Sequence, residues 1–386
     1  MSNRLDVVRG RSESMNSEDR STNQPFPEGN AIVYCEGAFG TTNGKTAHGL
    51  IRRSRRYKVL AVVDSVQAEK DAGEVLDGRF AGIPIEKDVM SAYRNALAAD
   101  LEPTHLVVGL APDGGRLDPA ARSDIRRAIR LSLNVDSGLH DYLSDDVEIA
   151  AVAEDYGVTL RDVRKPPSLS KMHFFSGKIT EVESFKVAVL GTDSAVGKRT
   201  TAWMLVDALA ELGLKSELVG TGQTAWLQGA RYGIVLDSLV NDFVAGEIEH
   251  AVWTAWTERS PEVIVLEGQG SLMNPAYPGG YELLAAGRPD VVVLQHAPAR
   301  KEYDGFPGHR LHSLDHQIKA IEVVSGRPVV AITINHEDLA KSEIEATCDE
   351  ISREIGLPVF DVLTHGADKL ARRIHGLMPR PSAASC

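Results

Sequence analysis

The sequence predicts an α/β protein with two domains, each built around a parallel β-sheet. The chain has 386 residues, more than one hydrophobic core usually contains. Short apolar runs alternate with helix-like segments along most of the chain, a pattern typical of parallel sheets. Pro166 and Pro167 interrupt that alternation, and we place the junction between the domains there.

We expect five segments along the chain. The N-terminal one is polar and lacks apolar periodicity, so we expect it to be disordered and do not expect it to act as a secretion signal. The segments are a disordered tail over 1–28, a Rossmann-like domain over 29–165, a linker over 166–183, a second domain over 184–376 and a tail over 377–386.

In the first domain, the apolar run AIVYCEG predicts the opening strand and TAHGLIRRS a helix after it. YKVLAVVD and THLVVGL predict further strands, and DPAARSDIRRAIRLSL predicts an amphipathic helix. We therefore expect a small sheet of three or four strands.

The first domain also contains a glycine-rich turn, EGAFGTTNGKTAHG, in which Lys45 is next to Thr46. With Asp64 at the end of the second strand, this arrangement is typical of a dinucleotide site, but the glycines lack G-x-G-x-x-G spacing. The turn therefore predicts either a bound ligand, including an acyl acceptor held between the domains, or a turn without a ligand.

The second domain opens with FKVAVLG, a fully apolar run typical of a strand buried in a parallel sheet. Apolar residues then recur at helical spacing, and Gly213 is suited to the C-terminus of that helix. Further strands are predicted at SELVG, EVIVLEG, DVVVLQH, RPVVAITIN and PVFDVL. With the glycine-rich turn that follows FKVAVLG, this order predicts a P-loop NTPase-like domain.

The segment VAVLGTDSAVGKRTTA predicts a phosphate-binding loop between a strand and a helix. Backbone N–H groups, the helix N-terminus and Lys198 would present positive charge to a phosphate, and Gly197 would let the backbone approach it. A glycine-rich turn without a ligand is the alternative. We assign cofactor binding to Gly191, Thr192, Asp193, Ser194, Ala195, Val196, Gly197, Lys198, Arg199, Thr200 and Thr201.

The loop departs from the common form in two ways. Five residues separate Gly191 from Gly197 instead of four, and Arg199 replaces the Ser or Thr that usually follows the lysine. The hydroxyl that would ligate magnesium is displaced to Thr200 or Thr201. The sequence therefore favours phosphate binding but not ordinary ATP hydrolysis.

Two strand ends supply catalytic candidates. Glu267 follows the run EVIVL at the carboxyl edge of the predicted sheet, where α/β proteins bind ligands. It would hold magnesium, accept a substrate proton or cap the glycine turn behind it. His296 ends DVVVLQH and is either a base or a hydrogen-bonded edge residue. We assign Glu267 and His296 as the catalytic candidates.

The loop after His296 is rich in basic residues. Arginine and lysine bind carboxylates well, so we assign substrate binding to Arg300, Lys301 and Arg310, with a solvated charged loop as the alternative. The spacing of three histidines would place them on one helical face, but no glutamate-containing zinc motif accompanies them, and we assign no metal site. These histidines are His309, His312 and His316.

Two further groups are weaker candidates for ligand contacts. Thr221, Gln223 and Thr224 follow a predicted strand. Asp237 and Asp242 lie near a helix start, where N-capping is the plain alternative.

The segments GTDSAVGK and LEGQG resemble the phosphate loop and second-strand glutamate of dethiobiotin-synthetase-like P-loop proteins. Over about residues 31–310, the layout resembles a bacterial and archaeal family that joins a Rossmann-like domain to a divergent P-loop domain. Characterised members are D-glutamate N-acetyltransferases. The segments that carry the resemblance are EGAFGTTNGKTA, GTDSAVGKRTT, VGTGQTAWLQG, DSLVNDF, LEGQGSLMNPAYPG and VVLQHAPARKEYDGFP.

The resemblance implies an acyltransferase that moves acetyl from acetyl-CoA to an acidic amino acid, D-glutamate first, in D-amino acid catabolism. Coenzyme A ends in a phosphorylated ADP, and acetyl transfer does not cleave its diphosphate. The missing magnesium ligand after Lys198 fits such a reaction, and Arg199 would neutralise an extra phosphate. The alternatives are an ATP- and Mg-dependent ligase of dethiobiotin-synthetase type and a nucleotide-binding regulatory protein; an NAD-dependent enzyme is more distant.

The composition argues against some classes of binding partner. A net charge of -12 argues against nucleic acid and anionic membranes, and no apolar run approaches the roughly 20 residues of a membrane helix. The three cysteines are far apart and fit a reducing cytoplasm. We expect a cytoplasmic enzyme for small molecules that forms a homo-oligomer.

Overall fold

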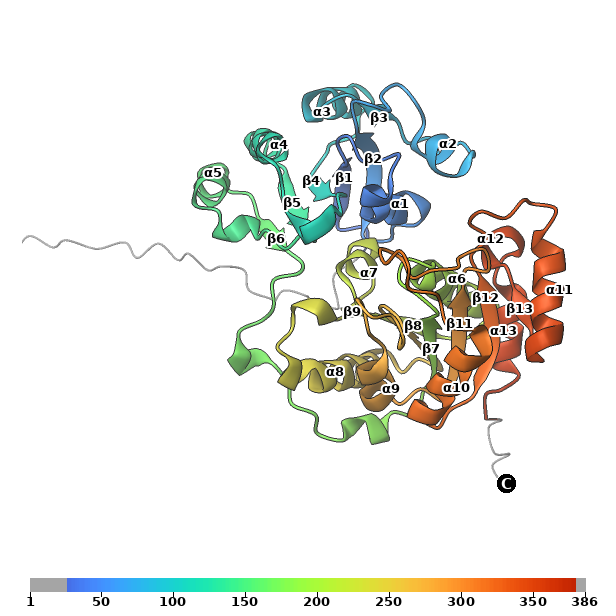
Figure 1. Cartoon of the computed structure of the whole chain (residues 1–386). Coiled ribbons are helices and arrows are strands. Elements are labelled where there is room, and N and C mark those ends of the chain that lie inside the picture. The colour runs from blue at the N-terminus through green and yellow to red at the C-terminus, as the bar shows by residue number, and fades with distance from the viewer. Residues whose placement is uncertain (1–25, 380–386) are drawn as a thin grey trace, which may run out of the picture.

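The computed structural model describes residues 26–379 and places one α/β domain above another (Figure 1). All strand pairs in both sheets are parallel. The two-domain α/β prediction is therefore confirmed. The predicted tails lie outside the described residues, except for 26–28 and 377–379.

The first sheet has the strand order β3-β2-β1-β4-β5-β6, in which the order reverses beside β1, as in Rossmann folds. Its strands are β1 (Gly29–Tyr34), β2 (Tyr57–Val63), β3 (Ile85–Glu86), β4 (His105–Val108), β5 (Asn134–Ser137) and β6 (Leu160–Asp162). Its helices are α1 (Lys45–Arg52), α2 (Ala72–Asp77), α3 (Val89–Ala98), α4 (Pro119–Arg130) and α5 (Val147–Tyr156).

The expected count of three or four strands in this sheet was wrong, because the sheet has six. The strands that the sequence pattern missed are β3, β5 and β6, with the sequences IE, NVDS and LRD. These segments are short and partly polar, so they have no apolar period of their own. They become strands because they pair with longer neighbours.

The second sheet has the order β13-β12-β11-β7-β10-β8-β9. Its strands are β7 (Phe185–Gly191), β8 (Ser216–Gly220), β9 (Tyr232–Gly233), β10 (Val263–Glu267), β11 (Val291–His296), β12 (Val329–Ile334) and β13 (Val359–Phe360). Its helices are α6 (Lys198–Glu211), α7 (Gln223–Gln228), α8 (Asn241–Arg259), α9 (Tyr281–Gly287), α10 (Leu314–Ser325), α11 (Ile344–Ile355), α12 (Val362–His365) and α13 (Asp368–His375).

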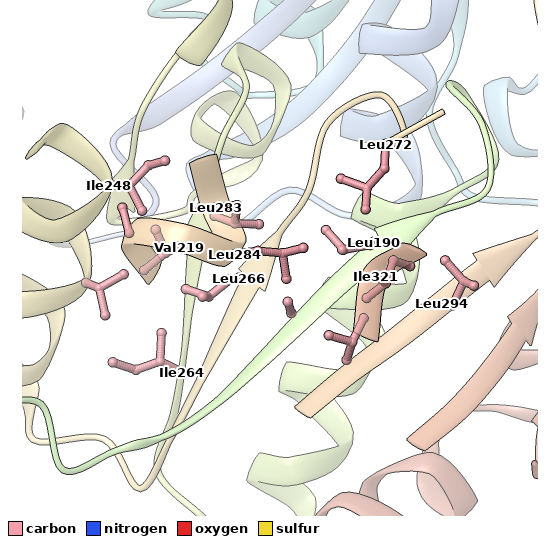
Figure 2. Packing of buried hydrophobic residues seen from close by; sticks show 14 of the residues in the cluster. Leu190, Val219, Ile248, Ile264, Leu266, Leu272, Leu283, Leu284, Leu294 and Ile321 are labelled. Carbon is pink, nitrogen blue, oxygen red and sulfur yellow. The ribbon is translucent and has the colours of Figure 1, made fainter. Parts of the chain in front are cut away.

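Helices cover both faces of the second sheet, so its central strand β7 is buried throughout. Successive residues of β7 belong to opposite cores: Ala188 and Leu190 to one, Val187 and Val189 to the other. Figure 2 shows the first of these cores, in which Leu190 and Leu266 pack with leucines of α9. This packing fixes the strand that delivers the phosphate loop.

The two domains meet where α1 packs against α7 (Figure 1). The Gln228 side-chain amide donates to the carbonyl of Gly49 at 2.6 Å, and Arg53 forms two hydrogen bonds of 2.7 Å with Asp207 of α6. Arg56 Nε donates to the Trp226 carbonyl at 2.8 Å. These contacts hold the first domain over the carboxyl edge of the second sheet.

Between the sheets, the chain from 163 to 184 runs along α8 and contains two short 3₁₀ helices, Leu169–Lys171 and Lys178–Glu181. The buried carboxylate of Glu249 on α8 accepts hydrogen bonds from the Ser176 backbone and hydroxyl and from the Ile179 backbone. The connection is thus attached to the second domain. Within residues 26–379, no helix is both long and apolar enough to cross a membrane.

Candidate functional site

The predicted phosphate loop joins β7 to α6, and Lys198 begins the helix. Its ammonium donates to the carbonyl of Asp193 at 2.7 Å, across the loop. A Cβ at Gly191 would lie 2.8 Å from Lys198 Cδ and 2.9 Å from Val196 Cγ2, so a larger residue would displace the folded-back lysine and the buried valine. Gly197 has a φ of +103°, which a side chain would strain. Both glycines are therefore required by the shape of the loop.

Burial lowers the pKa of Lys198 to about 8, although Glu267 and Asp193 favour its charged form. The backbone amides at the start of α6 and the Lys198 ammonium both lie at the loop that follows the C-terminal end of β7. A loop of this kind is suited to bind phosphate oxygens. The structure thus has the local geometry that the sequence predicts, while ligand binding itself stays a prediction.

Asp193 is a fully buried carboxylate inside the loop. Its Oδ2 accepts from Arg300 Nη1 at 2.9 Å and from the Asp304 backbone at 2.8 Å, while Oδ1 accepts from the Asn274 side chain at 2.7 Å. Two other loops, which follow β10 and β11, therefore hold the phosphate loop in place. Buried charges are tolerated only with such partners.

The three basic substrate candidates lie in different surroundings. Arg300 binds Asp193 and also donates to Glu337 at 2.6 and 2.9 Å, so its guanidinium is already engaged. Lys301 and Arg310 are exposed. Their predicted substrate role stays a prediction, and the geometry gives Arg300 a clear structural one.

Glu267 ends β10 and is 7% exposed. Its Oε2 has no hydrogen-bond partner within the part of the chain that the structure describes. Burial raises the pKa of Glu267, against the opposing effect of Arg199 and Lys198. A buried carboxylate with an unpartnered oxygen and a raised pKa has the properties of a general base.

His296 ends β11 beside the loop, with Nδ1 3.0 Å from the Thr192 hydroxyl. Burial lowers the pKa of His296 to about 4, and the charges of Lys301 and Arg300 add to that effect. The imidazole is therefore neutral at pH 7. A group with so low a pKa is a weak proton acceptor.

The residues after Lys198 point in different directions. Thr201 donates its hydroxyl to Gln295 Oε1 at 2.5 Å, and Thr333 donates to the same oxygen at 2.6 Å. Thr200 is half-buried on the first turn of α6. Arg199 extends toward α1 of the first domain, where its Nη2 lies 3.0 Å from the point that a Cβ on Gly49 would occupy.

The turn of the first domain is closed by its own residues. Asp64 accepts from the Phe39 backbone at 2.8 Å and from the Val66 backbone at 2.9 Å, and the Phe39 ring is buried. Asp64 thus stabilises the turn. Thr46, by contrast, reaches the second domain, where its hydroxyl lies 3.1 Å from that of Thr224.

The remaining candidates are dispersed. The Thr221 hydroxyl donates to the Glu267 carbonyl at 2.7 Å, Gln223 begins α7, and Asp237 pairs with Arg164. Asp242 lies in the first turn of α8, which has no side-chain cap.

The helical face expected for His309, His312 and His316 does not form, because α10 begins only at Leu314. The His312 and His316 rings do meet, with centroids 5.4 Å apart, and His312 Nδ1 lies 2.7 Å from the Tyr303 hydroxyl. Over residues 26–379, no group of three His, Cys, Asp or Glu side chains is arranged to hold a metal ion.

Sequence reasoning missed Asn274, Gln295 and Gln228. Gln295 had a recognisable signal, because a glutamine inside the apolar run VVVLQ implies a buried hydrogen-bond network. Asn274 and Gln228 had none, because their partners Asp193 and Gly49 lie far away in the sequence.

Comparison with known proteins gives consistent results. A family model described as "Domain of unknown function (DUF1611_C) P-loop domain" matches residues 173–371, and another, "Domain of unknown function (DUF1611_N) Rossmann-like domain", matches residues 65–166. A crystal structure of a DUF1611 family protein from Anabaena variabilis superposes with a TM-score of 0.81 at 28% identity, and the match covers 90% of this chain and 99% of that one.

Two similar proteins are named D-glutamate N-acetyltransferase. The one from Tritonibacter scottomollicae is 32% identical over 271 residues, which cover 69% of this chain and 79% of the relative. The one from Pseudoalteromonas sp. is 29% identical over 288 residues, which cover 72% and 83%.

Proposed function

Because this chain belongs to the DUF1611 family, with its Rossmann-like and P-loop domains, we propose that it is an N-acetyltransferase. It moves acetyl from acetyl-CoA to the amino group of an acidic amino acid, D-glutamate in particular. The names of the two relatives support this reaction. We propose that it acts in the cytoplasm in D-glutamate breakdown.

The phosphate loop would hold the diphosphate of coenzyme A. The Thr192 and Ser194 amides already donate to the Gln295 carbonyl and to Asp193 Oδ1. The amides at the end of the loop and the start of α6 therefore supply the positive field together with the Lys198 ammonium, and Arg300 holds the loop in shape through Asp193. Of the two hydroxyls that could ligate magnesium, that of Thr201 donates to Gln295 instead, and Thr200 is half-buried on the first turn of α6. This arrangement suits a phosphate group that is bound and not cleaved.

The observation that carries the proposal is the Glu267 carboxylate, buried beside Lys198 with Oε2 unpartnered among the described residues. Amino acids are mostly ammonium ions at pH 7, so a base must remove a proton before the nitrogen can attack. Glu267 takes that proton. Its raised pKa brings its basicity closer to that of the amine than an ordinary carboxylate has.

The reaction then balances as follows. The neutral amine attacks the acetyl carbonyl, the N–C bond forms and the C–S bond breaks. The nitrogen loses a second proton, which ends on the thiol of coenzyme A, while the proton on Glu267 returns to solvent. His296 is too weakly basic at pH 7 for this step, so we give it the role of orienting Thr192 in the loop.

Thiol release tests the proposal. The protein is incubated with acetyl-CoA and a panel of D- and L-amino acids, and free coenzyme A is followed with a thiol reagent. We expect release with D-glutamate and little with amino acids that have apolar side chains. Absence of release with every amino acid, together with ADP formation from ATP and magnesium, would instead support the ligase alternative.

A further inference from the structure

Arg199 and Lys198 are neighbours in sequence, but their side chains extend to different parts of the structure. Successive residues of a helix are about 100° apart around its axis, so Lys198 faces the phosphate loop while Arg199 reaches the first domain. There, three side chains surround the point that a Cβ on Gly49 would occupy. The distances to that point are 3.0 Å from Arg199 Nη2, 3.1 Å from Thr224 Cγ2 and 3.4 Å from Gln228 Cδ. Polar side chains therefore meet where α1 faces α7.

Two side chains of this meeting point, and Glu267 at the end of β10, have buried polar atoms without a partner among the described residues. Within residues 26–379, six buried side-chain N or O atoms have no hydrogen-bond partner, and three of them are Arg199 Nε, Gln228 Oε1 and Glu267 Oε2. Gln228 is 4% exposed and Glu267 7%. Buried polar atoms normally have partners, so these atoms are available to a ligand or to bound water.

The charges in this cluster are complementary. Both side chains lie against the start of α7. Arg199 Nη2 meets Thr224 there, and Glu267 Oε2 lies 3.6 Å from the point that a Cβ on Gly220 would occupy, with Ala225 Cβ 2.5 Å from the same point. Each charge favours the charged form of the other. Burial lowers the pKa of Arg199 and raises that of Glu267, which means that neither charge is fully compensated by the other. A molecule with one cationic and one anionic group would satisfy both.

We propose that Arg199 binds the α-carboxylate of the acyl acceptor while Glu267 faces its amino group, so that the boundary between the domains forms the acceptor subsite. The amino and α-carboxylate groups of an amino acid share one carbon, and so match two opposite charges that lie near each other. The planar guanidinium donates two parallel hydrogen bonds to a carboxylate. This assignment rests on the proposed acetyl transfer.

The other cations are less suited to this task. Arg300 is engaged by Asp193 and Glu337, Lys198 donates into the phosphate loop, and Lys301 and Arg310 are exposed. The competing assignment for Arg199 is an extra phosphate of coenzyme A. The two assignments predict different kinetic effects, because one concerns the acceptor and the other the acetyl donor.

Substitution of Arg199 separates them. We expect R199M to raise the KM for D-glutamate about 100-fold, the effect of losing hydrogen bonds to a charged group, and to leave the KM for acetyl-CoA within about twofold. R199K keeps the charge but not the paired donors, and we expect a smaller rise. A raised KM for acetyl-CoA with an unchanged KM for D-glutamate would overturn the assignment.

The matched control is R52M. Arg52 lies on α1, and its charge acts on Arg199, but it pairs with Asp77 on the surface at 2.7 Å. We expect R52M to leave both KM values near those of the natural protein. The midpoint of urea unfolding of each variant shows that the protein is folded.

Changing the acceptor gives a second test. D-isoglutamine lacks the α-carboxylate and D-glutamine lacks only the γ-carboxylate. We expect D-isoglutamine to react poorly with the natural protein and to lose nothing more in R199M, whereas D-glutamine should remain sensitive to the substitution. Equal sensitivity of both amides to R199M would contradict binding of the α-carboxylate.

Equilibrium binding distinguishes failure of this inference from failure of the proposed function. D-glutamate is titrated into the natural protein and into R199M in the presence of coenzyme A, without turnover. Binding that disappears in R199M supports the subsite even if no acetyl transfer is found. Equal binding by both proteins, or no binding by the natural protein, overturns it even if transfer occurs.

Discussion

Arg300 Nη1 lies 2.9 Å from Oδ2 of Asp193, and through this contact the loop after β11 holds the phosphate loop. The carboxylate is fully buried, so removal of the guanidinium would leave a buried charge with one partner fewer. We expect R300M to destabilise the second domain by about 3 kcal/mol, the lower end for a broken buried pair. The measurement is the midpoint of urea unfolding.

The control for Arg300 is K301M, because Lys301 is exposed and its ammonium donates to the Pro298 carbonyl at 3.4 Å, a contact within its own loop. A surface change of this kind should alter stability by less than about 0.5 kcal/mol. A stable R300M protein that no longer binds D-glutamate would favour the substrate role predicted from sequence.

The pKa of Lys198 predicts how cofactor affinity depends on pH. The ammonium is charged below about pH 8 and neutral above it, because burial lowers its pKa. We expect the Kd for coenzyme A to rise between about pH 8 and pH 9.5, by at most about tenfold per pH unit, and to be higher and independent of pH in K198M. Calorimetry at several pH values measures this. A flat profile in the natural protein would exclude Lys198 as a phosphate ligand.

Glu267 links activity to stability. We expect E267Q to lower kcat by roughly 100-fold or more, the usual contribution of a general base. Burial raises the pKa of Glu267 in the folded protein above its value in the unfolded chain. At pH values between these two pKa values, the folded protein binds more protons than the unfolded chain. The stability of the folded protein therefore falls as the pH rises through this range. The neutral amide introduced by E267Q has no buried charge, so the stability of the variant would not fall with pH in this way.

The melting temperature of E267Q relative to the natural protein should therefore increase from about pH 4.5 to about pH 8. Differential scanning calorimetry at both pH values measures the difference. A difference that is the same at both pH values would show that Glu267 carries no unfavourable buried charge.

Gly49 offers a test of the domain boundary. Gly49 lies within α1, and replacing glycine by alanine inside a helix stabilises the helix by roughly 1 kcal/mol. Its Cβ, however, would lie 3.0 Å from Arg199 Nη2 and displace the guanidinium. The new Cβ would also lie 3.1 Å from Thr224 Cγ2, which offsets the gain in helix stability. We therefore expect G49A to raise the KM for the acceptor with little change in its melting temperature. An unchanged KM would mean that the position of Arg199 does not matter for the acceptor.

Magnesium separates the acetyltransferase from the ligase alternative. The Thr201 hydroxyl donates to Gln295 at 2.5 Å, and Arg199 occupies the usual position of the magnesium ligand. We expect excess EDTA to leave acetyl transfer unchanged. Loss of activity with EDTA, restored by magnesium, would contradict a reaction in which the diphosphate is only bound.

Much of the fold could be predicted because its signals are local. The apolar run FKVAVLG became β7, and GTDSAVGK became the loop before α6. The run PVFDVL contains β13, whereas the two-residue strands β3 and β9 carried no signal, because pairing with a neighbour makes them strands. Of the candidate residues, Glu267 and His296 lie at strand ends as expected, because the end of an apolar run marks the edge of a sheet.

The sequence by itself determined the two parallel sheets and the amide-lined loop around Lys198, since both depend on residues that are adjacent in the chain. Only the tertiary structure decided which arginine and lysine side chains are already paired with a carboxylate. Arg300 meets Asp193 across 107 positions, while Arg199 faces the other domain with its Nε unpartnered among residues 26–379. A charge is available to a ligand only if no distant residue has already compensated it, and contacts between distant residues arise when the chain folds.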